Sequence, residues 1–362
     1  MHSPEIAEKL LAWYDKGRRI LPWRESRDPY HIWVSEIMLQ QTRVEAVKPY
    51  YDRFLKALPT IQDLAEADEE LLLKLWEGLG YYNRVRNLQK AARVMMEQHQ
   101  GQMPADYDAL LALPGIGSYT AGAVASIAFG IPAPAVDGNV MRVFARLDAD
   151  AEDILLPAHK RRIEAELAEL MPADRPGDMN QSLMELGAMV CLPNGAPKCE
   201  SCPLQDLCKA RAAGNMTDYP VKKPKAKRKI ENMTVFVIES ENRLVIRKRP
   251  NKGLLAGLYE LPHAEGFLDE TGAVEYVRSL GVEPLQVKAL PEAKHIFTHK
   301  EWHMKGFSVK IDEIRLADAL ENGRLTAEFL IAKEEIEKKY PIPSAFDAFM
   351  RKEKERKAIF TK

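Results

Sequence analysis

The spacing of apolar residues changes once along this chain, and that change limits the possible folds more than any other feature. From Pro4 to about Leu207, apolar residues recur three and four positions apart, which predicts amphipathic helices. Further on, residues 233–239 (MTVFVIE) and 243–249 (RLVIRKR) favour short strands around a polar break. The chain therefore contains two regions of different structural class.

A basic segment lies between the two regions. Residues 220–229, PVKKPKAKRK, hold two prolines, six basic residues and no aromatic residue. Such a composition is typical of a solvated linker, and a charged tether explains it at least as well as a contact with nucleic acid. Because 362 residues are enough for about two domains, we predict a multidomain protein. An all-α region spans 1–219, a basic linker 220–230, and an α+β domain 231–362.

Several segments carry the clearest patterns. The segments with helical spacing are EIAEKLLAWY (5–14), VKPYYDRFLKAL (47–58), EELLLKLWEGL (69–79), NRVRNLQKAARVMMEQH (83–99) and HKRRIEAELAELM (159–171). In the second domain we expect residues 293–312 to continue as strands and FLIAKEEIEKKYPIPSAFDAFMRKEKER (329–356) to be helical.

Charge and hydropathy argue against membrane insertion and export. The net charge of −1 indicates no polyanionic partner, so any such site must be local. The N-terminus lacks the apolar stretch of a signal peptide, and we expect a soluble, cytoplasmic protein. Residues 109–136 contain no charge, but three prolines and four glycines divide them. This stretch predicts a hairpin followed by one buried helix.

All four cysteines fall in one short loop. Cys191, Cys199, Cys202 and Cys208 are separated by seven, two and five residues. Four thiolates this close together can surround a tetrahedral metal or an iron–sulfur cluster, and the spacing alone does not separate zinc from a 4Fe–4S cluster. Two disulfides are a poorer explanation in a chain without an export signal. We predict a metal-bearing loop at 191–208.

Glu36 is a carboxylate among apolar neighbours. On a helix, the residues three and four positions away are Ile32, Trp33, Leu39 and Gln40. A carboxyl group in such surroundings is costly unless it is protonated or paired. Burial would raise its pKa and keep it able to donate a proton near neutral pH. An ion pair with Arg24 or Arg43 is an equally good explanation.

Asp137 is the first charge after the uncharged stretch. It can cap a helix that begins at Gly138, and capping would fix its direction and lower its pKa. A protonated Glu36 together with an ionised Asp137 suits cleavage of a glycosidic bond through an oxocarbenium-like transition state.

The stretch LPGIGSYTAGA (113–123) places two glycines before a helix. The glycines leave backbone amides unshielded, and these amides can converge with the helix N-terminus on one anion. The loop holds no lysine and is not a Walker P-loop. Alone it would be an ordinary turn. Beside the acid pair and the cysteine loop, a DNA phosphate is the better explanation.

Taken in order, the hairpin, the aspartate in VDGNV and the cysteine loop resemble the helix–hairpin–helix DNA glycosylase superfamily, which includes endonuclease III. The stretches LPWR, WVSEIMLQQT and GLGYYNRVRNL and the C-terminal domain resemble the MutY-type adenine DNA glycosylases, which excise adenine mispaired with 8-oxoguanine. The resemblance covers nearly the whole chain. It implies an all-α glycosylase core with a six-helix barrel domain, an iron–sulfur domain and a tethered Nudix-like domain.

The resemblance also implies roles for residues that match the family motifs. Glu36 would protonate adenine, Asp137 would stabilise or covalently trap the sugar cation, and Tyr119 and Asn139 would orient these groups. Endonuclease III-type lyases carry a lysine at the position of Tyr119, so a tyrosine there implies a glycosylase without lyase activity. The residues implied to bind DNA in this region are Arg24, Gln41, Thr42, Leu79, Tyr81, Gly115 and Gly117.

By the same resemblance, the cysteines would hold a 4Fe–4S cluster. The family places six residues between the first two cysteines, where this chain has seven, so the shape of that loop is in question.

The second domain resembles the Nudix-like part of the family through VIRKRPNKGLLAGLYELP (245–262). It lacks the R-E-x-x-E-E cluster that holds magnesium in Nudix hydrolases, so pyrophosphohydrolase activity is not expected. Phe297, Thr298 and His299 resemble the family's loop that reads 8-oxoguanine. Without the resemblance, HIFTH would be an ordinary edge strand.

The implied partner is double-stranded DNA that contains adenine opposite 8-oxoguanine or guanine. We expect a monomer, associated with the nucleoid of a prokaryotic cell. Two rivals are an endonuclease III-like glycosylase/lyase and a non-catalytic iron–sulfur DNA-binding protein.

Overall fold

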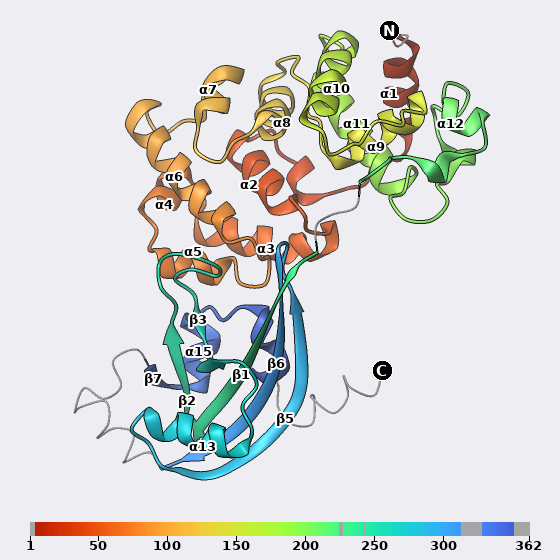
Figure 1. Ribbon diagram of the computed structural model, residues 1–362. Coiled ribbons are helices and arrows are strands. Elements are labelled where there is room, and N and C mark those ends of the chain that lie inside the picture. Colours follow the sequence, from red (N-terminus) through yellow and green to blue (C-terminus); the bar gives the residue numbers. More distant parts are fainter. Residues whose placement is uncertain (1–3, 224–226, 242, 313–327, 351–362) are drawn as a thin grey trace. The chain divides into compact units, whose positions relative to one another are not determined.

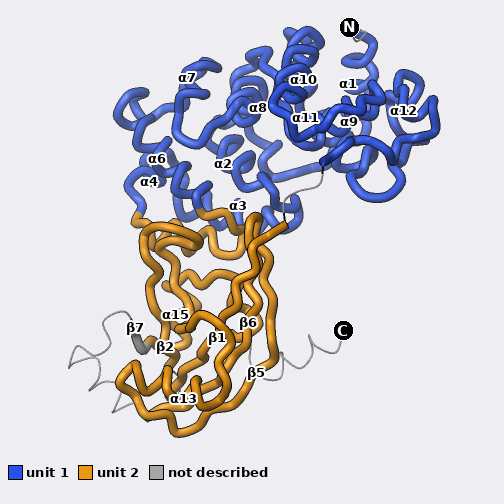
Figure 2. The backbone as a smooth tube through the Cα atoms, in the orientation of Figure 1, with its two compact units in different colours: residues 1–67, 83–225 blue, residues 68–82, 226–362 orange. Residues whose placement is uncertain are grey.

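The computed structural model describes residues 4–223, 227–241, 243–312 and 328–350 (Figure 1). The chain divides into two compact units (Figure 2). The helical unit consists of residues 1–67 and 83–225, and the sheet unit of residues 68–82 and 226–362. The division after residue 225 falls in the basic linker that the sequence predicts, of which residues 224–226 lie outside the described part. The assignment of 68–82 to the sheet unit was not predicted.

The helical unit holds a series of helices joined by turns and loops of different lengths. They are α1 (Glu5–Gly17), η1 (Pro22–Arg24), α2 (Pro29–Leu39), α3 (Val44–Ala57), α4 (Ile61–Glu66), α6 (Asn83–Gln98), α7 (Tyr107–Ala112), α8 (Ser118–Phe129), α9 (Gly138–Asp148), α10 (Pro157–Leu170), α11 (Pro176–Met189), η2 (Cys199–Ser201), α12 (Lys209–Ala212) and η3 (Met216–Asp218).

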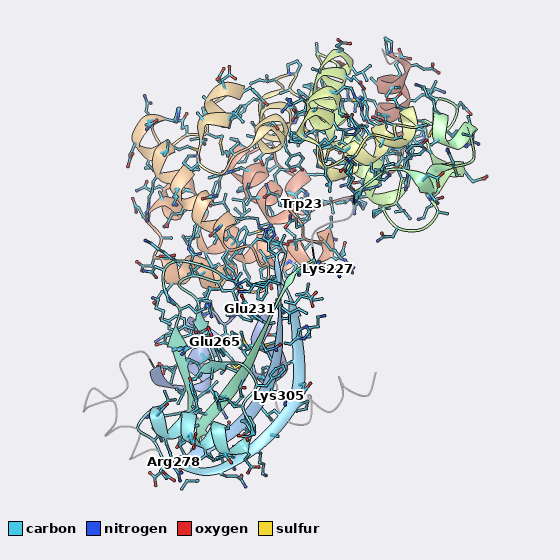
Figure 3. All side chains as sticks on the ribbon, in the orientation of Figure 1. Trp23, Lys227, Glu231, Glu265, Arg278 and Lys305 are labelled. Atoms are coloured by element: carbon cyan, nitrogen blue, oxygen red, sulfur yellow. The ribbon has the colours of Figure 1, made fainter. Side chains whose placement is uncertain are left out.

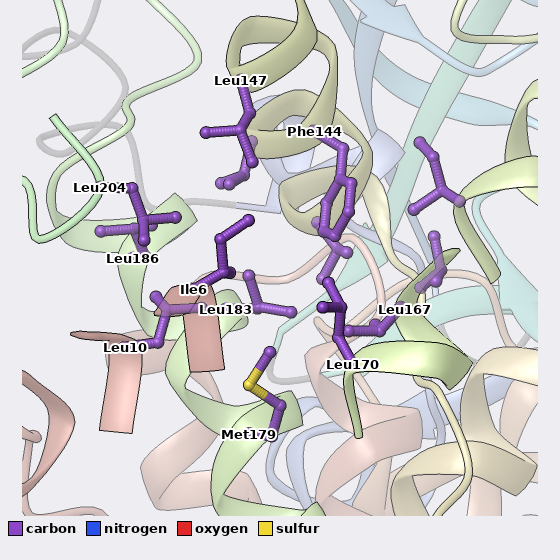
Figure 4. Close-up of a cluster of buried hydrophobic side chains, with 14 of the residues drawn as sticks. Ile6, Leu10, Phe144, Leu147, Leu167, Leu170, Met179, Leu183, Leu186 and Leu204 are labelled. Carbon is purple, nitrogen blue, oxygen red and sulfur yellow. The ribbon is translucent and has the colours of Figure 1, made fainter. Parts of the chain in front are cut away.

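One apolar cluster joins α1, α9, α10 and α11 (Figure 4). Leu10, Phe144, Leu167 and Leu183 are all almost fully buried in it. Three of the cysteines pack against its edge, namely Cys191, Cys202 and Cys208. The cysteine loop therefore rests on the same core that holds α9 in place.

Helix α8 is the buried helix expected within the uncharged stretch. Seven of its twelve residues are buried, and it packs on α2, α7 and α11. The close approach of the chain after α8 depends on Gly122, where a Cβ atom would lie 2.0 Å from the carbonyl oxygen of Pro134. Within the described residues, no helix combines the length and apolar character that a membrane span requires.

The sheet unit holds a mixed seven-stranded sheet in the order β3-β2-β1-β6-β5, with β4 paired to β1 and β7 paired to β2. Strands β1 and β6 run parallel, and β5 and β6 run antiparallel. The elements are α5 (Glu69–Leu75), β1 (Lys229–Ser240), β2 (Arg243–Lys248), β3 (Tyr259–Glu260), β4 (His263–Glu265), α13 (Glu270–Ser279), β5 (Pro284–Ile296), β6 (Lys300–Ile311), β7 (Glu328–Ala332), α15 (Lys333–Lys339), η4 (Ser344–Phe346) and α16 (Asp347–Met350).

The two faces of the sheet bury different clusters, as the alternation of side chains along β1 requires. Val235 and Val237 face a cluster that includes Phe346 and Phe349. Phe236 and Ile238 face the other way, into a cluster that includes residues of α13. Burial on both faces explains why β1 is a continuous apolar run rather than an alternating one.

The fold confirms most predicted elements and differs from the prediction at four places. Helices are found in all five predicted helical segments of the first region, although α5 ends at Leu75, before the predicted end at 79. Residues 328–332, expected to be helical from 329, form strand β7 instead. Helix α13 was not predicted, and residues 351–356 of the predicted C-terminal helix lie outside the described part. The strand expected through HIFTH is interrupted by a turn between β5 and β6.

Candidate active site

Glu36 projects from α2 into the interior of the helical unit. Asp28 caps the helix by accepting hydrogen bonds from the backbone N–H groups of Tyr30 and His31. The Glu36 residue is only 6% exposed. Burial raises the pKa of its carboxyl group to about 7, a hydrogen bond from Tyr119 opposes this rise, and the nearby charge of Asp137 adds to it. Glu36 is thus substantially protonated near neutral pH.

Tyr119 holds the Glu36 carboxyl group in place. It is the second residue of α8, and its hydroxyl donates a short hydrogen bond to Glu36 Oε2. Burial raises the pKa of the Tyr119 phenol well above its ordinary value, so the phenol remains a donor. Arg24 pairs with Glu185 instead. The structure thus supports the buried acid over an ion pair with Arg24.

Asp137 caps α9 as predicted. Its Oδ1 accepts hydrogen bonds of 2.8 Å from the backbone N–H groups of both Asn139 and Val140. The expected lowering of its pKa is wrong in direction. Burial raises the pKa of the Asp137 carboxyl group and outweighs the opposing effect of the hydrogen bonds and of Arg142.

Asn139 links Asp137 to an arginine one turn further along α9. Its side-chain nitrogen donates to Asp137 Oδ2 at 2.7 Å, and its oxygen accepts from Arg142 Nη2 at 2.8 Å. Arg142, which is 7% exposed, also donates to the carbonyl oxygens of Gly187 and Cys191, both at 2.8 Å. The orientation of the Asp137 carboxylate is therefore connected to the backbone of the cysteine loop.

The four cysteines gather around one small cavity, which they line together with Arg146 and Arg211. Arg146 Nη1 lies 3.2 Å from Cys191 Sγ. Burial raises the pKa of the Cys202 thiol to about 12, so nearby cations or a bound metal would be needed to hold it as a thiolate. Four sulfur donors with two guanidinium groups beside them fit an anionic metal–thiolate centre such as an iron–sulfur cluster.

Of the two glycines in the hairpin before α8, only Gly115 has a backbone conformation that requires glycine. Gly115 has a φ of +77°, and a Cβ atom there would lie 2.5 Å from Asn87. Gly117 has ordinary extended backbone, and nothing lies within 4 Å of a Cβ at that position. Lys160 donates to Ser118 Oγ at 2.8 Å, which places a cation beside the first turn of α8.

Arg24 belongs to a buried charge network that the sequence analysis missed. Glu185 is 1% exposed and accepts from Arg19 Nε at 2.7 Å and from Arg24 Nη2 at 2.9 Å. These partners hold the pKa of Glu185 at about 2, despite its burial. A carboxylate within the apolar run MELGAM was the available signal.

Arg24 also lines a groove of about 580 Å³ that Trp23 and Gln181 share. Its charge lowers the pKa of Glu36, so the groove and the buried acid are electrostatically coupled.

Gln41 and Thr42 lie directly after α2. Gln41 is exposed and adopts a left-handed conformation, with φ 59°. The Thr42 hydroxyl donates to the carbonyl oxygen of Gln40, and the Gln40 side chain reaches Thr120 Oγ1 at 3.4 Å. This turn therefore touches α8, the helix that carries Tyr119.

The remaining candidate residues lie in the sheet unit. Tyr81 is 54% exposed, whereas Leu79 is 6% exposed. The hydroxyl groups of Tyr81 and Thr298 lie 3.4 Å apart. Phe297 packs edge-on against Trp302, and the exposed Thr298 and His299 occupy the turn between β5 and β6. The structure thus brings together two stretches that the sequence separates by more than two hundred residues.

Comparison with known proteins matches both parts of the chain. Residues 34–173 match the model of the HhH-GPD superfamily of base excision DNA repair proteins, and residues 234–352 match the NUDIX domain. A solved structure of a thermostable thymine-DNA glycosylase is similar over 57% of this chain and 95% of its own, with a TM-score of 0.53 and 32% identity.

Curated relatives are adenine DNA glycosylases. The protein from Arabidopsis thaliana is 42% identical over 300 residues, which are 72% of this chain and 47% of that protein. The protein from Buchnera aphidicola subsp. Baizongia pistaciae is 32% identical over 317 residues, covering 85% of this chain and 87% of that protein. The chain thus spans about half the length of the plant relative and most of the bacterial one.

Proposed function

Because this chain belongs to the adenine DNA glycosylase family, we propose that it removes adenine from duplex DNA by hydrolysing its N-glycosidic bond. The observation that carries the proposal is the pairing of two carboxyl groups in different environments. Glu36 is buried with a pKa of about 7, and Asp137 is fixed by backbone amides at a helix N-terminus. Such a pair divides into an acid and an anion.

Glu36 acts as the general acid. Its proton passes to a ring nitrogen of the flipped adenine, which leaves as a neutral base with the electrons of the N-glycosidic bond. Tyr119 keeps the carboxyl group in position through its hydrogen bond. An ionised Asp137 raises the pKa of Glu36 and so favours the protonated form that a general acid requires.

Asp137 stabilises the sugar cation left behind, or traps it covalently, before water completes the hydrolysis with retention. Asn139 and Arg142 orient its carboxylate. The adenine must first leave the base stack, which costs a few kcal/mol. Arg24, whose charge acts on the Glu36 carboxyl group, is the residue that we place near the flipped base.

The proposed substrate carries 8-oxoguanine or guanine opposite the adenine. Tyr81 and Thr298 support this assignment, because an exposed aromatic side chain and an exposed hydroxyl group lie together on the sheet unit. A wedge of this kind fills the gap in a distorted duplex. The Gly115 hairpin and the start of α8 would bind a phosphate. We propose that the protein acts as a monomer on the chromosome of a prokaryotic cell.

Cys191, Cys199, Cys202 and Cys208 would hold a 4Fe–4S cluster. The cluster would hold together a loop that has no hydrophobic core of its own. Because this loop packs against the core that includes α9, the cluster would also stabilise α9.

One assay tests the function. The protein is incubated with a duplex that carries adenine opposite 8-oxoguanine, and the products are separated with and without alkali. We expect free adenine, and strand breaks only after alkali, because a phenol at position 119 cannot form a Schiff base. Breaks without alkali would indicate a lyase. Absence of adenine release by metal-loaded protein would indicate a binding protein.

A further inference from the structure

The segment that carries Tyr81 belongs to the sheet unit, although it interrupts the helical unit in sequence. Residues 68–82 leave the helical unit after Ala67 and return to it at Asn83. Helix α5 of this segment packs on α15. Further contacts from the segment to the rest of the sheet unit come from three polar side chains, those of Glu70, Lys74 and Glu77.

Glu70 makes the first of these contacts. Its Oε1 accepts from Lys248 Nζ at 2.9 Å and from the Tyr259 hydroxyl group at 2.9 Å. Both partners hold the pKa of Glu70 below its usual value. Lys248 also lies over the Tyr259 ring, 5.4 Å from its centroid. The contact therefore combines an ion pair with a hydrogen bond from the hydroxyl group of the buried Tyr259.

Lys74 and Glu77 make the other contacts at the opposite end of α5. Glu77 Oε1 accepts from the backbone N–H of Ile342 at 2.8 Å. Lys74 Nζ bridges Glu77 Oε2 at 2.6 Å and the carbonyl oxygen of Ile336 at 3.2 Å. The partners on the sheet unit are backbone atoms, which move less than side-chain atoms do. These contacts therefore hold the segment at a fixed place on the sheet unit.

The turn that follows needs such support. Gly78, Gly80 and Tyr81 all have positive φ, at 97°, 69° and 48°. The left-handed conformation costs a residue such as tyrosine about 1–2 kcal/mol, and it persists only where the surroundings hold it. The indole N–H of the buried Trp76 donates to the carbonyl oxygen of Gly80 at 3.1 Å, which ties the turn to the anchored helix.

We propose that Glu70, Lys74 and Glu77 are positioning residues. They anchor the segment 68–82 to the sheet unit, so that this unit sets the place of both Tyr81 and Thr298 at the base opposite the adenine. The role at the opposite base rests on the function proposed above, whereas the anchoring of the segment does not. On this view the sheet unit presents a complete two-part probe, and the helical unit supplies the chemistry.

The first test measures amide hydrogen exchange in the full-length protein without DNA. The variant Glu70→Ala/Glu77→Ala removes both carboxylate anchors. We expect amides at 76–82 to exchange faster by on the order of tenfold, with α6 unchanged, because local opening no longer breaks these contacts. The control is Glu283→Ala, which removes an exposed ion pair with Arg278. Figure 3 labels Arg278, which lies on α13.

The second test compares excision of adenine opposite 8-oxoguanine and opposite guanine. For the double variant we expect the preference for 8-oxoguanine to fall by roughly threefold to tenfold, the range for losing partly exposed charged hydrogen bonds. The excision rate opposite guanine should stay near that of the control. Glu77→Gln keeps an acceptor for the Ile342 N–H and should retain most of the preference.

The outcomes separate the two proposals. Unchanged exchange at 76–82 would overturn the anchoring. Faster exchange with an unchanged preference would overturn its use in recognition. If the wild-type protein releases adenine from neither duplex, the proposed function fails, and with it the role at the opposite base, while the exchange data still decide the anchoring.

Discussion

At the scale of single residues, the raised pKa of Glu36 has a consequence for stability. Its carboxyl group has a pKa of about 7 in the folded chain, against an ordinary value of 4.5. The folded state therefore binds this proton more tightly than the unfolded state does. This contribution to stability is complete below pH 4.5 and is lost as the pH rises through about 7.

Replacing the carboxyl group by an amide removes this dependence. Between pH 4 and pH 8, the free energy of unfolding of the wild type should fall by about 3 kcal/mol relative to that of Glu36→Gln. Urea titrations at several pH values measure the difference. A constant offset between the two proteins across this range would mean that Glu36 titrates normally. Excision by the variant should be lost at every pH, since an amide donates no catalytic proton.

A substitution at Asp137 can separate its helix-capping role from its proposed catalytic role. Asparagine is as good a cap as aspartate, so Asp137→Asn should cost less than about 1 kcal/mol of stability. The missing negative charge should reduce adenine excision by at least about 100-fold, as for other groups that stabilise charge in a transition state. Single-turnover excision and duplex affinity are measured on the same preparation. An excision rate near that of the wild type would contradict the role of Asp137, whereas duplex binding should be retained.

The sequence pointed to Glu36 and Asp137 as a pair, but it did not predict the direction of the Asp137 pKa shift. Apolar neighbours placed Glu36 in the interior correctly, because burial follows from local periodicity. The direction of the Asp137 pKa was wrong, because the balance between burial and hydrogen bonds depends on side chains from other elements. Glu185 was missed for the same reason. Its partners, Arg19 and Arg24, lie more than one hundred and fifty residues away in sequence.

At the scale of elements, the position of α8 depends on one glycine. A Cβ atom at Gly122 would lie 2.0 Å from the carbonyl oxygen of Pro134, a backbone atom. We expect Gly122→Ala to destabilise the protein by on the order of 2–3 kcal/mol, because the backbone must shift to make room. Gly17→Ala is the matched control. It also lies in a helix, has nothing within 4 Å of its Cβ, and should be neutral or slightly stabilising. Equal melting temperatures for the two variants would contradict this account.

Helix α9 connects the acid pair to the cysteine loop through Arg142. The guanidinium group donates to Asn139, Gly187 and Cys191 at once, which the single nitrogen of lysine does not reproduce. We expect Arg142→Lys to lose about 2–4 kcal/mol of stability, since buried carbonyl oxygens are left without donors. Excision should also fall, because Asn139 loses the group that orients it. Full activity with full stability would show that the connection is unimportant.

Elements were predicted where local periodicity determines them. The long amphipathic helices of the first region follow from spacing alone. Strand β7 was mistaken for helix because FLIA is a short apolar run, whose structure is decided by pairing with β2. The turn at 297–299 agrees with the loop that the family resemblance implied, whereas the local pattern of HIFTH alone favoured a strand.

At the scale of the whole molecule, the division of the chain after residue 225 falls within the predicted linker, whereas the place of segment 68–82 in the sheet unit was not predicted. The composition change near residue 225 is local and visible, and the division of the chain falls there. Within the sheet unit, Glu70 and Glu77 of this segment contact partners that lie more than one hundred and seventy residues further along the chain. Helical spacing in this segment predicts α5 but not the unit on which it packs.

This organisation sharpens what removal of the second domain would do. A chain of residues 1–230 keeps Glu36, Tyr119 and Asp137, which all belong to the helical unit. It loses Thr298 and also the partners that hold Tyr81 in place. We expect excision opposite 8-oxoguanine to fall by about tenfold more than excision opposite guanine, which corresponds to about 1.4 kcal/mol of lost discrimination.

A full-length comparison separates the two losses. Thr298→Ala/His299→Ala removes the side chains of the turn but leaves Glu70, Lys74 and Glu77 with their partners. It should therefore lose less discrimination than the truncated chain, and the difference measures what the anchored segment contributes. Helical circular dichroism checks that the truncated chain is folded. If a folded truncated chain discriminates as well as the full-length protein, the base opposite adenine is read by the helical unit alone.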